Sequence, residues 1–145
     1  MKTFKIYTCG AMRGRSLEQS MEWRKSIAEK ITELSIRNIR YVHPPLYYNY
    51  DFNNHKSEKE VMEWELSQLA SSDIVIVNND GLDTSVGSLV EMGAIQAVNM
   101  FGQKHIFVVG LGKEDEFHPW IKEMCLRIEE NESDLAEFIA QYLLI

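Results

Sequence analysis

Two glutamates, Glu91 and Glu65, have the side chains most informative about chemistry in this sequence. Glu91 follows the first turn of an apolar segment, and the residues three, four and seven positions after it are all apolar. A carboxylate on an apolar helix face costs free energy unless it is paired or used in a reaction. The alternative is a first-turn glutamate that interacts favourably with the helix dipole.

Glu65 supplies a second carboxylate, beside an apolar stripe of the expected helix over 58–70. Paired carboxylates are what cleavage of a glycosidic bond requires, because one attacks the anomeric carbon and the other gives a proton to the leaving group. Tyr7 lies near the end of an expected strand, where its hydroxyl can approach a carboxylate. The alternatives are an exposed helix-surface glutamate and a core tyrosine with its hydroxyl satisfied elsewhere.

The segment CGAMRGR, residues 9–15, has the composition of an anion-binding loop. Gly10 and Gly14 permit tight turns and close approach of the backbone to a ligand. Arg13 and Arg15 place two cations before the start of an expected helix. The segment lacks the Gly-Lys-Ser/Thr end of a P-loop and the GxGxxG pattern, so a solvated turn with surface arginines is an equally weighted alternative.

The segment NNDGLDTSVGSLVE is the second candidate for anion binding. Asp83, Thr84 or Ser85 is placed to cap the helix that follows, and Gly87 and Ser88 leave its first turn uncrowded. Hydroxyls and small residues at a helix N-terminus favour anion binding, although ordinary capping is common. The two segments are expected to follow adjacent strands, and their coincidence favours one shared ligand.

The histidines and cysteines are less informative. His43 and His118 each precede a proline and have no partner at metal-ligand spacing, so no metal site is expected. Cys9 lacks an accompanying cysteine–histidine signature, and two cysteines make neither a disulfide framework nor a metal cluster. A cluster of aromatic residues either stacks on a planar base or forms a subunit contact. Its members are Tyr47, Tyr48, Tyr50 and Phe52.

Length and composition are those of an ordinary globular chain. The chain has 145 residues, of which 45% are hydrophobic and 26% charged, and its net charge is −7. These values suit a single domain over residues 1–145 and exclude a disordered or fibrous chain. The negative charge argues against a nucleic-acid polymer as partner. Without a membrane-length apolar run or a signal peptide, the expected location is cytoplasmic.

Strands are expected to alternate with helices along the chain. The hydrophobic pattern predicts strands over 2–8, 39–42, 73–77, 104–109 and 126–128. It predicts helices over 16–34, 58–70, 85–100, 118–124 and 133–144. The helix over 85–100 is apolar all round and is expected to be buried. A polar, aromatic loop is expected after Pro44 and Pro45, which end the second strand.

This alternation predicts an α/β fold. The expected architecture is one doubly wound parallel sheet of about five strands, flavodoxin-like or Rossmann-like, with helices on both faces. In such folds ligands bind outside the carboxyl ends of the strands. That rule selects four loops as candidates for a site: 9–15, 43–50, 78–88 and 110–117.

Three stretches make the chain resemble the nucleoside 2-deoxyribosyltransferase family: KIYTCGAMRGR, the strand DIVIV after an acidic helix, and SVGSLVEMGAIQA. Within the family it is most similar to the 2′-deoxynucleoside 5′-phosphate N-hydrolases, whose first loop reads Tyr-x-Cys-Gly-x-x-Arg-Gly. The likeness covers residues 5 to about 109. The third stretch departs from the family's pattern in the spacing of one internal glycine, and it has an isoleucine where the family has an alanine. It matches at Ser85, Gly87, Glu91 and Gly93.

The resemblance implies a role for each matching residue. Glu91 matches the nucleophile that forms a glycosyl-enzyme, and Tyr7 matches the tyrosine that positions it. Glu65 stands where the family has an aspartate that assists protonation of the departing base, and this departure leaves its role as acid open. Substrate contacts are implied for residues at the two anion-binding segments. These are Cys9, Gly10, Met12, Arg13, Gly14, Ser85, Gly87 and Ser88.

Ser85 distinguishes two branches of the family. Base-exchanging transferases that use free nucleosides tend to have an acid at this position, whereas monophosphate hydrolases have a serine, because a carboxylate repels phosphate. With Arg13 and the Gly14 backbone, Ser85 implies a pocket for a 5′-phosphate. The resemblance further implies no metal or organic cofactor, and a homodimer in which a neighbouring subunit completes each site.

The leading hypothesis is cleavage of the N-glycosidic bond of a 2′-deoxynucleoside 5′-monophosphate, with release of the free base. The first alternative is a transferase that exchanges bases between free deoxynucleosides. The second is a nucleotide-binding or sensor protein that kept the fold and lost turnover. The replacement at Glu65 and the long insertion LYYNYDFNNHKSEKE leave this second alternative open. A different ligand on the same α/β scaffold is a weaker hypothesis, because fold does not determine function.

Overall fold

The computed structural model describes residues 1–48, 55–102 and 104–145. Its strands are β1 (Thr3–Cys9), β2 (Asn38–Val42), β3 (Ile74–Asn78), β4 (Phe107–Leu111) and β5 (Arg127–Glu129). Its helices are α1 (Leu17–Leu34), α2 (Pro44–Tyr48), α3 (Glu58–Ala70), α4 (Val86–Phe101), α5 (Pro119–Met124) and α6 (Glu132–Phe138). None of the helices in these ranges is both long and apolar enough to cross a membrane.

The five strands form one sheet in the order β2-β1-β3-β4-β5, and all four pairings are parallel. The predicted α/β class and parallel sheet are therefore confirmed. Tyr7 of β1 lies opposite Val42 of β2 on one side and Val75 of β3 on the other. The direction of winding reverses between β1 and β3, and such switch points are where open α/β sheets bind ligands.

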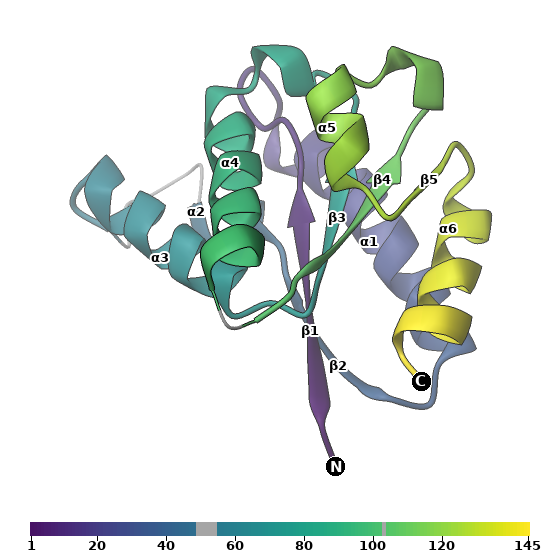
Figure 1. Ribbon diagram of the computed structural model, residues 1–145. Coiled ribbons are helices and arrows are strands. Elements are labelled where there is room, and N and C mark those ends of the chain that lie inside the picture. Colours follow the sequence, from purple (N-terminus) through teal and green to yellow (C-terminus); the bar gives the residue numbers. More distant parts are fainter. Residues whose placement is uncertain (49–54, 103) are drawn as a thin grey trace.

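Helices cover both faces of the sheet (Figure 1), as the alternation predicted. The side chain of Ile6 packs with Ile27 of α1 and Leu135 of α6 on one face. The next side chain, Tyr7, belongs to the core on the opposite face, with residues of α3, α4 and α5. Successive residues of a strand alternate between faces, so β1 contributes to both cores.

Several boundaries follow the predictions closely. The helix over 58–70 is α3 with the same limits, and α1 begins one residue after its cap, Ser16. Ser16 accepts a hydrogen bond from the backbone N–H of Gln19, whose side chain in turn accepts from the Ser16 N–H. This reciprocal capping box satisfies two N–H groups that the helix leaves without partners.

Other local predictions are wrong. The expected loop after β2 begins with the short helix α2, because proline is tolerated in a first helical turn, where its missing N–H has no acceptor. Residues 82–84, expected as loop, form a 3₁₀ turn. Strand β4 starts at Phe107, three residues later than predicted. The last helix ends at Phe138, and Ile139–Leu143 continue it as a π-helical turn.

The expectation that the helix over 85–100 is buried on all sides is also wrong. α4 buries Glu91, Met92 and Ile95 against the sheet and α3. Its opposite face is open to solvent, with Val86 71% and Phe101 82% exposed. Helix α3 and the sheet pack against only one side of α4. Apolar side chains on the other side of α4 are therefore not covered by other elements of this chain.

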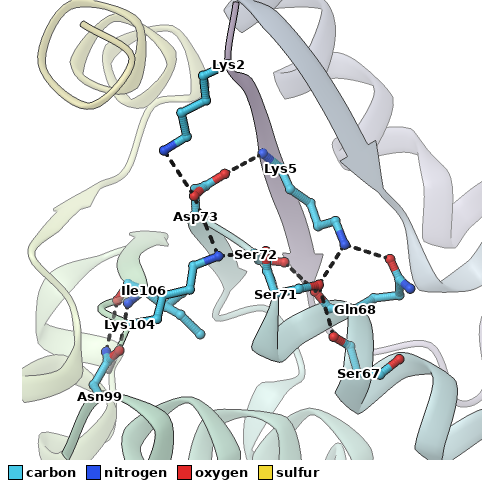
Figure 2. A network of polar contacts seen from close by, with 10 residues as sticks. All are labelled: Lys2, Lys5, Ser67, Gln68, Ser71, Ser72, Asp73, Asn99, Lys104 and Ile106. Carbon is cyan, nitrogen blue, oxygen red and sulfur yellow. Dashed lines mark hydrogen bonds and ion pairs between the residues drawn. The ribbon is translucent and has the colours of Figure 1, made fainter. Parts of the chain in front are cut away.

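Asp73 joins three strands at the amino edge of the sheet (Figure 2). Its carboxylate accepts the backbone N–H of Lys5 at 2.8 Å, its own N–H donates to the Lys5 carbonyl, and its carbonyl accepts the N–H of Phe107. The ammonium groups of Lys2 and Lys104 lie 3.4 Å and 3.6 Å from the same carboxylate. Burial acts to raise the pKa of Asp73, but these donors and cations hold it below its ordinary value.

Candidate active site

A cavity of about 860 Å³ lies beyond the carboxyl ends of β1 and β3. The loop after β1, one face of α3 and the start of α4 line it. Of the four loops selected from the sequence, 9–15, 43–50 and 78–88 contribute residues to this cavity. The loop 110–117 instead lines a separate cavity of about 660 Å³. Three of the four loops that the topological rule selected thus border one cavity, which α3 and α4 also line.

Glu91 lines this cavity and is in direct contact with Tyr7, which is fully buried. Glu91 is buried in the second turn of α4, and the hydroxyl of Tyr7 donates a hydrogen bond to its Oε2. Burial raises the pKa of Glu91 to about 7, although the Tyr7 hydroxyl and the charge of Arg24 act to lower it. Burial and the charge of Glu91 also raise the pKa of Tyr7, so its hydroxyl keeps its proton.

Glu65 of α3 faces the same cavity. Its Oε1 is buried and has no hydrogen-bond partner within the described ranges. Burial, and secondly the charge of Glu91, raise the pKa of Glu65 to about 8. Because the pKa of Glu65 is the higher of the two, a proton held by the pair resides preferentially on Glu65, and a negative charge on Glu91. Two carboxyl groups whose pKa values are pushed apart in this way are suited to act as acid and nucleophile.

The residues expected to bind an anion also line the cavity. Arg13, Gly14, Ser85, Gly87 and Ser88 all line it, as does Met12. Gly14 has φ +77°, a conformation that favours glycine. The hydroxyl of Ser85 donates to that of Ser88 at 2.8 Å and does not cap α4. The first N–H groups of a helix have no acceptor within it, so the start of α4 presents donors to the cavity.

Two expectations for the first loop need correction. Arg15 does not point into the cavity, because its guanidinium pairs with the Asp80 carboxylate at 3.3 Å. Cys9, expected to contact the substrate, is fully buried and does not line the cavity, with its thiol 3.8 Å from the Ser88 carbonyl. Gly10 lines the cavity as expected, and an added Cβ at this position would lie 2.9 Å from Trp23.

The histidines serve local packing. His43 Nδ1 lies 2.8 Å from the hydroxyl of Thr8, and burial, with the charges of Arg24 and Lys25, lowers its pKa to about 4. His118 accepts the backbone N–H of Trp120 at the start of α5. Among the described residues, no three His, Cys, Asp or Glu side chains are grouped so as to hold a metal ion.

Of the aromatic cluster, Tyr47 packs between helices and Tyr48 lines the cavity. Tyr47 stacks on Trp64 with ring centres 3.6 Å apart, which fastens α2 to α3. Tyr48 lines the cavity, and its hydroxyl donates to Glu58 at 2.8 Å. Tyr50 and Phe52 lie outside the described residues.

Sequence reasoning missed Arg24. Its side chain is fully buried under the first loop, where it donates to the carbonyl of Gly10 and the hydroxyl of Thr8. The signal was present, since Ser20, Arg24, Ile27 and Ile31 follow one another at spacings of four, three and four residues. An arginine within such a buried stripe is unusual, because burying a charge costs free energy.

Comparison with known proteins places this architecture in a family. A family model described as nucleoside 2-deoxyribosyltransferase like matches residues 3–111, which include every residue of the site. A conserved protein from Enterococcus faecalis V583 has a similar fold, with a TM-score of 0.70 and 18% identity over 97% of this chain and 99% of that one. Curated proteins yield no match. Since the family model covers the first four strands and both glutamates of the cavity, the chain belongs to the nucleoside 2-deoxyribosyltransferase-like family.

Proposed function

We propose that the protein cleaves the N-glycosidic bond of 2′-deoxynucleoside 5′-monophosphates through a glycosyl-enzyme on Glu91. One observation carries the proposal. A single cavity holds a carboxylate oriented by a tyrosine hydroxyl and a second carboxyl group of higher pKa. Membership of the family supports the broader statement that the protein is an enzyme with deoxyribosyltransferase-like chemistry on small nucleoside substrates.

The first step forms the covalent intermediate. The ionised carboxylate of Glu91 attacks C1′ of the sugar, and the bond from C1′ to the base nitrogen breaks. The electron pair of that bond leaves with the base, which takes the proton of the Glu65 carboxyl group. The hydrogen bond from Tyr7 holds the attacking carboxylate in one orientation, so the reacting atoms meet with less loss of entropy.

Water resolves the intermediate in the second step. The Glu65 carboxylate, now without its proton, accepts one from water as the water oxygen attacks C1′. The ester bond to Glu91 breaks, and the products are the free base and 2-deoxyribose 5-phosphate. Glu65 regains the proton it gave, and Glu91 regains its charge, so the cycle closes without a further reactant.

The 5′-phosphate is the anion expected in the cavity. Arg13 provides a positive charge to the cavity wall, and the start of α4 provides backbone donors. Ser85 lines the same cavity without introducing a negative charge. A carboxylate at the same place would repel a phosphate, which favours a monophosphate over a free nucleoside as substrate.

Product analysis tests the proposal. The wild type is incubated with a panel of deoxynucleoside monophosphates and free deoxynucleosides, with and without an added base, beside Glu91→Gln. The control is Glu63→Gln, whose side chain is 63% exposed on the outer part of α3. We expect free base from monophosphates, no product from Glu91→Gln, and full activity of the control. New nucleosides formed from free deoxynucleosides would indicate a transferase, and nucleotide binding without any product would indicate a binding protein.

We also propose that the exposed face of α4 pairs with a second copy of the chain. Glu91 is the sole charged residue among Val86–Phe101, and it is buried, so this face is uncharged on a molecule of net charge −7. Another copy can therefore approach there without charge repulsion. Val86 and Val90 belong both to this face and to the cavity wall, so a partner would border the site.

The oligomeric state tests this pairing. Sedimentation of the wild type should give the mass of a dimer, and Phe101→Asp should shift the equilibrium to the monomer. Ile36→Asp is the matched control, because Ile36 is 96% exposed just beyond α1, away from α4. A monomeric wild type, or equal effects of both substitutions, would contradict an interface on α4.

A further inference from the structure

We propose that Arg24 is a positioning residue of this site: it holds the first substrate loop, and it places a permanent positive charge beneath the two glutamates of the cavity. The inference rests on the proposed function, because it assigns the source of the charge balance that the two carboxyl groups need. It concerns a side chain beneath the cavity that does not line it.

The geometry of the guanidinium group supports the first part. Arg24 is fully buried in the middle of α1. Its Nε donates to the Thr8 hydroxyl at 3.2 Å, its Nη2 to the Gly10 carbonyl at 3.1 Å, and its Nη1 to the Ser20 carbonyl at 2.5 Å. The planar fork therefore joins the end of β1, the loop after it and α1.

Packing below the loop depends on the same group. Gly10 lies directly over the Trp23–Arg24 pair, since a Cβ at this position would meet the Trp23 ring at 2.9 Å and Arg24 Nη2 at 3.5 Å. The guanidinium lies 4.7 Å from the centre of the Trp23 ring. The backbone that leads to Met12, Arg13 and Gly14 is thus supported by a charged side chain in the core.

Charged and titratable groups from four elements face Arg24 and the two glutamates. Arg24 remains protonated at all relevant pH values, so its charge is permanent. When Glu65 is protonated and Glu91 is ionised, the two carboxyl groups together carry one negative charge. The facing groups are Tyr7 and Cys9 of β1, His43 after β2, Glu58 and Glu65 of α3, and Glu91 of α4.

The balance of these charges supports the second part. Burial raises the pKa of both glutamates, and the charge of Arg24 acts in the opposite direction on both. His43 adds no competing charge, because burial, with the charges of Arg24 and Lys25, lowers its pKa to about 4. Arg24 with ionised Glu91 and protonated Glu65 is electrically neutral, which is the least costly state for buried groups.

Three substitutions separate charge from shape. Arg24→Met and Arg24→Gln remove the charge, whereas Arg24→Lys keeps it and loses the planar fork. We expect the acid limb of kcat/KM to move up by about one pH unit in the uncharged variants. For Arg24→Lys we expect the limb to stay in place and KM to rise, because the loop is held less well. Arg40→Met, on the exposed part of β2, is the matched control and should change neither.

A readout that needs no activity distinguishes this inference from the proposed function. NMR titration of ¹³C-labelled glutamate and of the His43 ring follows each group in the folded variants. We expect the midpoint of Glu91 to rise and that of His43 to move toward 6.5 in Arg24→Met or, should that variant unfold, in Arg24→Gln. Unchanged midpoints in either folded variant would overturn the inference, as would an equal shift in Arg24→Lys. The midpoints report on Arg24 even if the wild type cleaves no nucleotide.

Discussion

Replacing Glu65 by glutamine is expected to stabilise the protein at alkaline pH, although it removes the group that we assign as the acid. Burial and the charge of Glu91 raise the pKa of Glu65 from 4.5 to about 8. The ionised form of Glu65 therefore destabilises the folded state. Glutamine has nearly the same shape and no charge, so it avoids this cost at every pH.

The sign and size of the effect follow from proton binding. Between pH 4.5 and about 8 the folded protein holds a proton on Glu65 that the unfolded chain has released, so the free energy of unfolding falls as pH rises. Across this window one such group lowers the free energy of unfolding by up to roughly 4 to 5 kcal/mol. Solvent that enters the cavity screens part of the charge, so we expect Glu65→Gln to be about 2 kcal/mol more stable than the wild type at alkaline pH.

Urea denaturation at about pH 4.5 and about pH 8.5 measures this difference. Wild type and Glu65→Gln should be nearly equally stable at the lower pH, and the variant should be more stable at the higher pH. Glu63→Gln is the control, because Glu63 lies in the same helix with its side chain 63% exposed. A stability difference that is the same at both pH values would refute the reasoning from burial.

Three further predictions test other parts of the molecule. The kcat/KM for a monophosphate should be bell-shaped with limbs near 7 and 8, and Tyr7→Phe should raise the acid limb, because the lost hydroxyl favoured the ionised nucleophile. Gly10→Ala should lower stability by about 1 to 3 kcal/mol in thermal denaturation, since its Cβ meets Trp23. Asp73→Asn should cost about 1 to 2 kcal/mol at neutral pH in urea denaturation, and the difference should vanish as pH falls through the lowered pKa of Asp73.

Each of these has a distinct contrary outcome. An acid limb that Tyr7→Phe leaves in place would show that the hydroxyl does not act on the nucleophile. Gly87→Ala is the control for Gly10, because its Cβ meets nothing within 4 Å, and equal losses would contradict the packing argument. A cost of Asp73→Asn that does not decrease as pH falls below the ordinary pKa of an aspartate would mean that the ion pairs at the amino edge are not its source.

Local sequence patterns were sufficient for most of the fold. Apolar spacing predicted α3 within its true limits, and the β-branched run before Asn78 predicted a strand buried on both faces. Alternation of strands and helices then implied a parallel sheet, since a right-handed crossover is the usual connection. The same reasoning failed at α2 and at the start of β4, where capping and pairing with distant residues set the limits.

The site was predicted in outline and corrected in detail. The loops after β1 and β3 were expected to share a ligand, and both line one cavity. The sequence pattern did not predict the direction in which each side chain of the first loop points. Arg15 turns away to Asp80, and Cys9 lies in the core, although both belong to the first loop motif.

The residue types and their order along the chain were enough to predict an α/β sheet, a binding edge and two carboxylates for glycosidic chemistry. They could not assign the protonation of those carboxylates, because a pKa depends on burial and on charges that arrive from other elements. Glu65 and Glu91 acquire different pKa values only when α3 and α4 pack over β1, with Arg24 beneath them. Tertiary packing likewise leaves one face of α4 exposed, which its uniformly apolar sequence did not indicate.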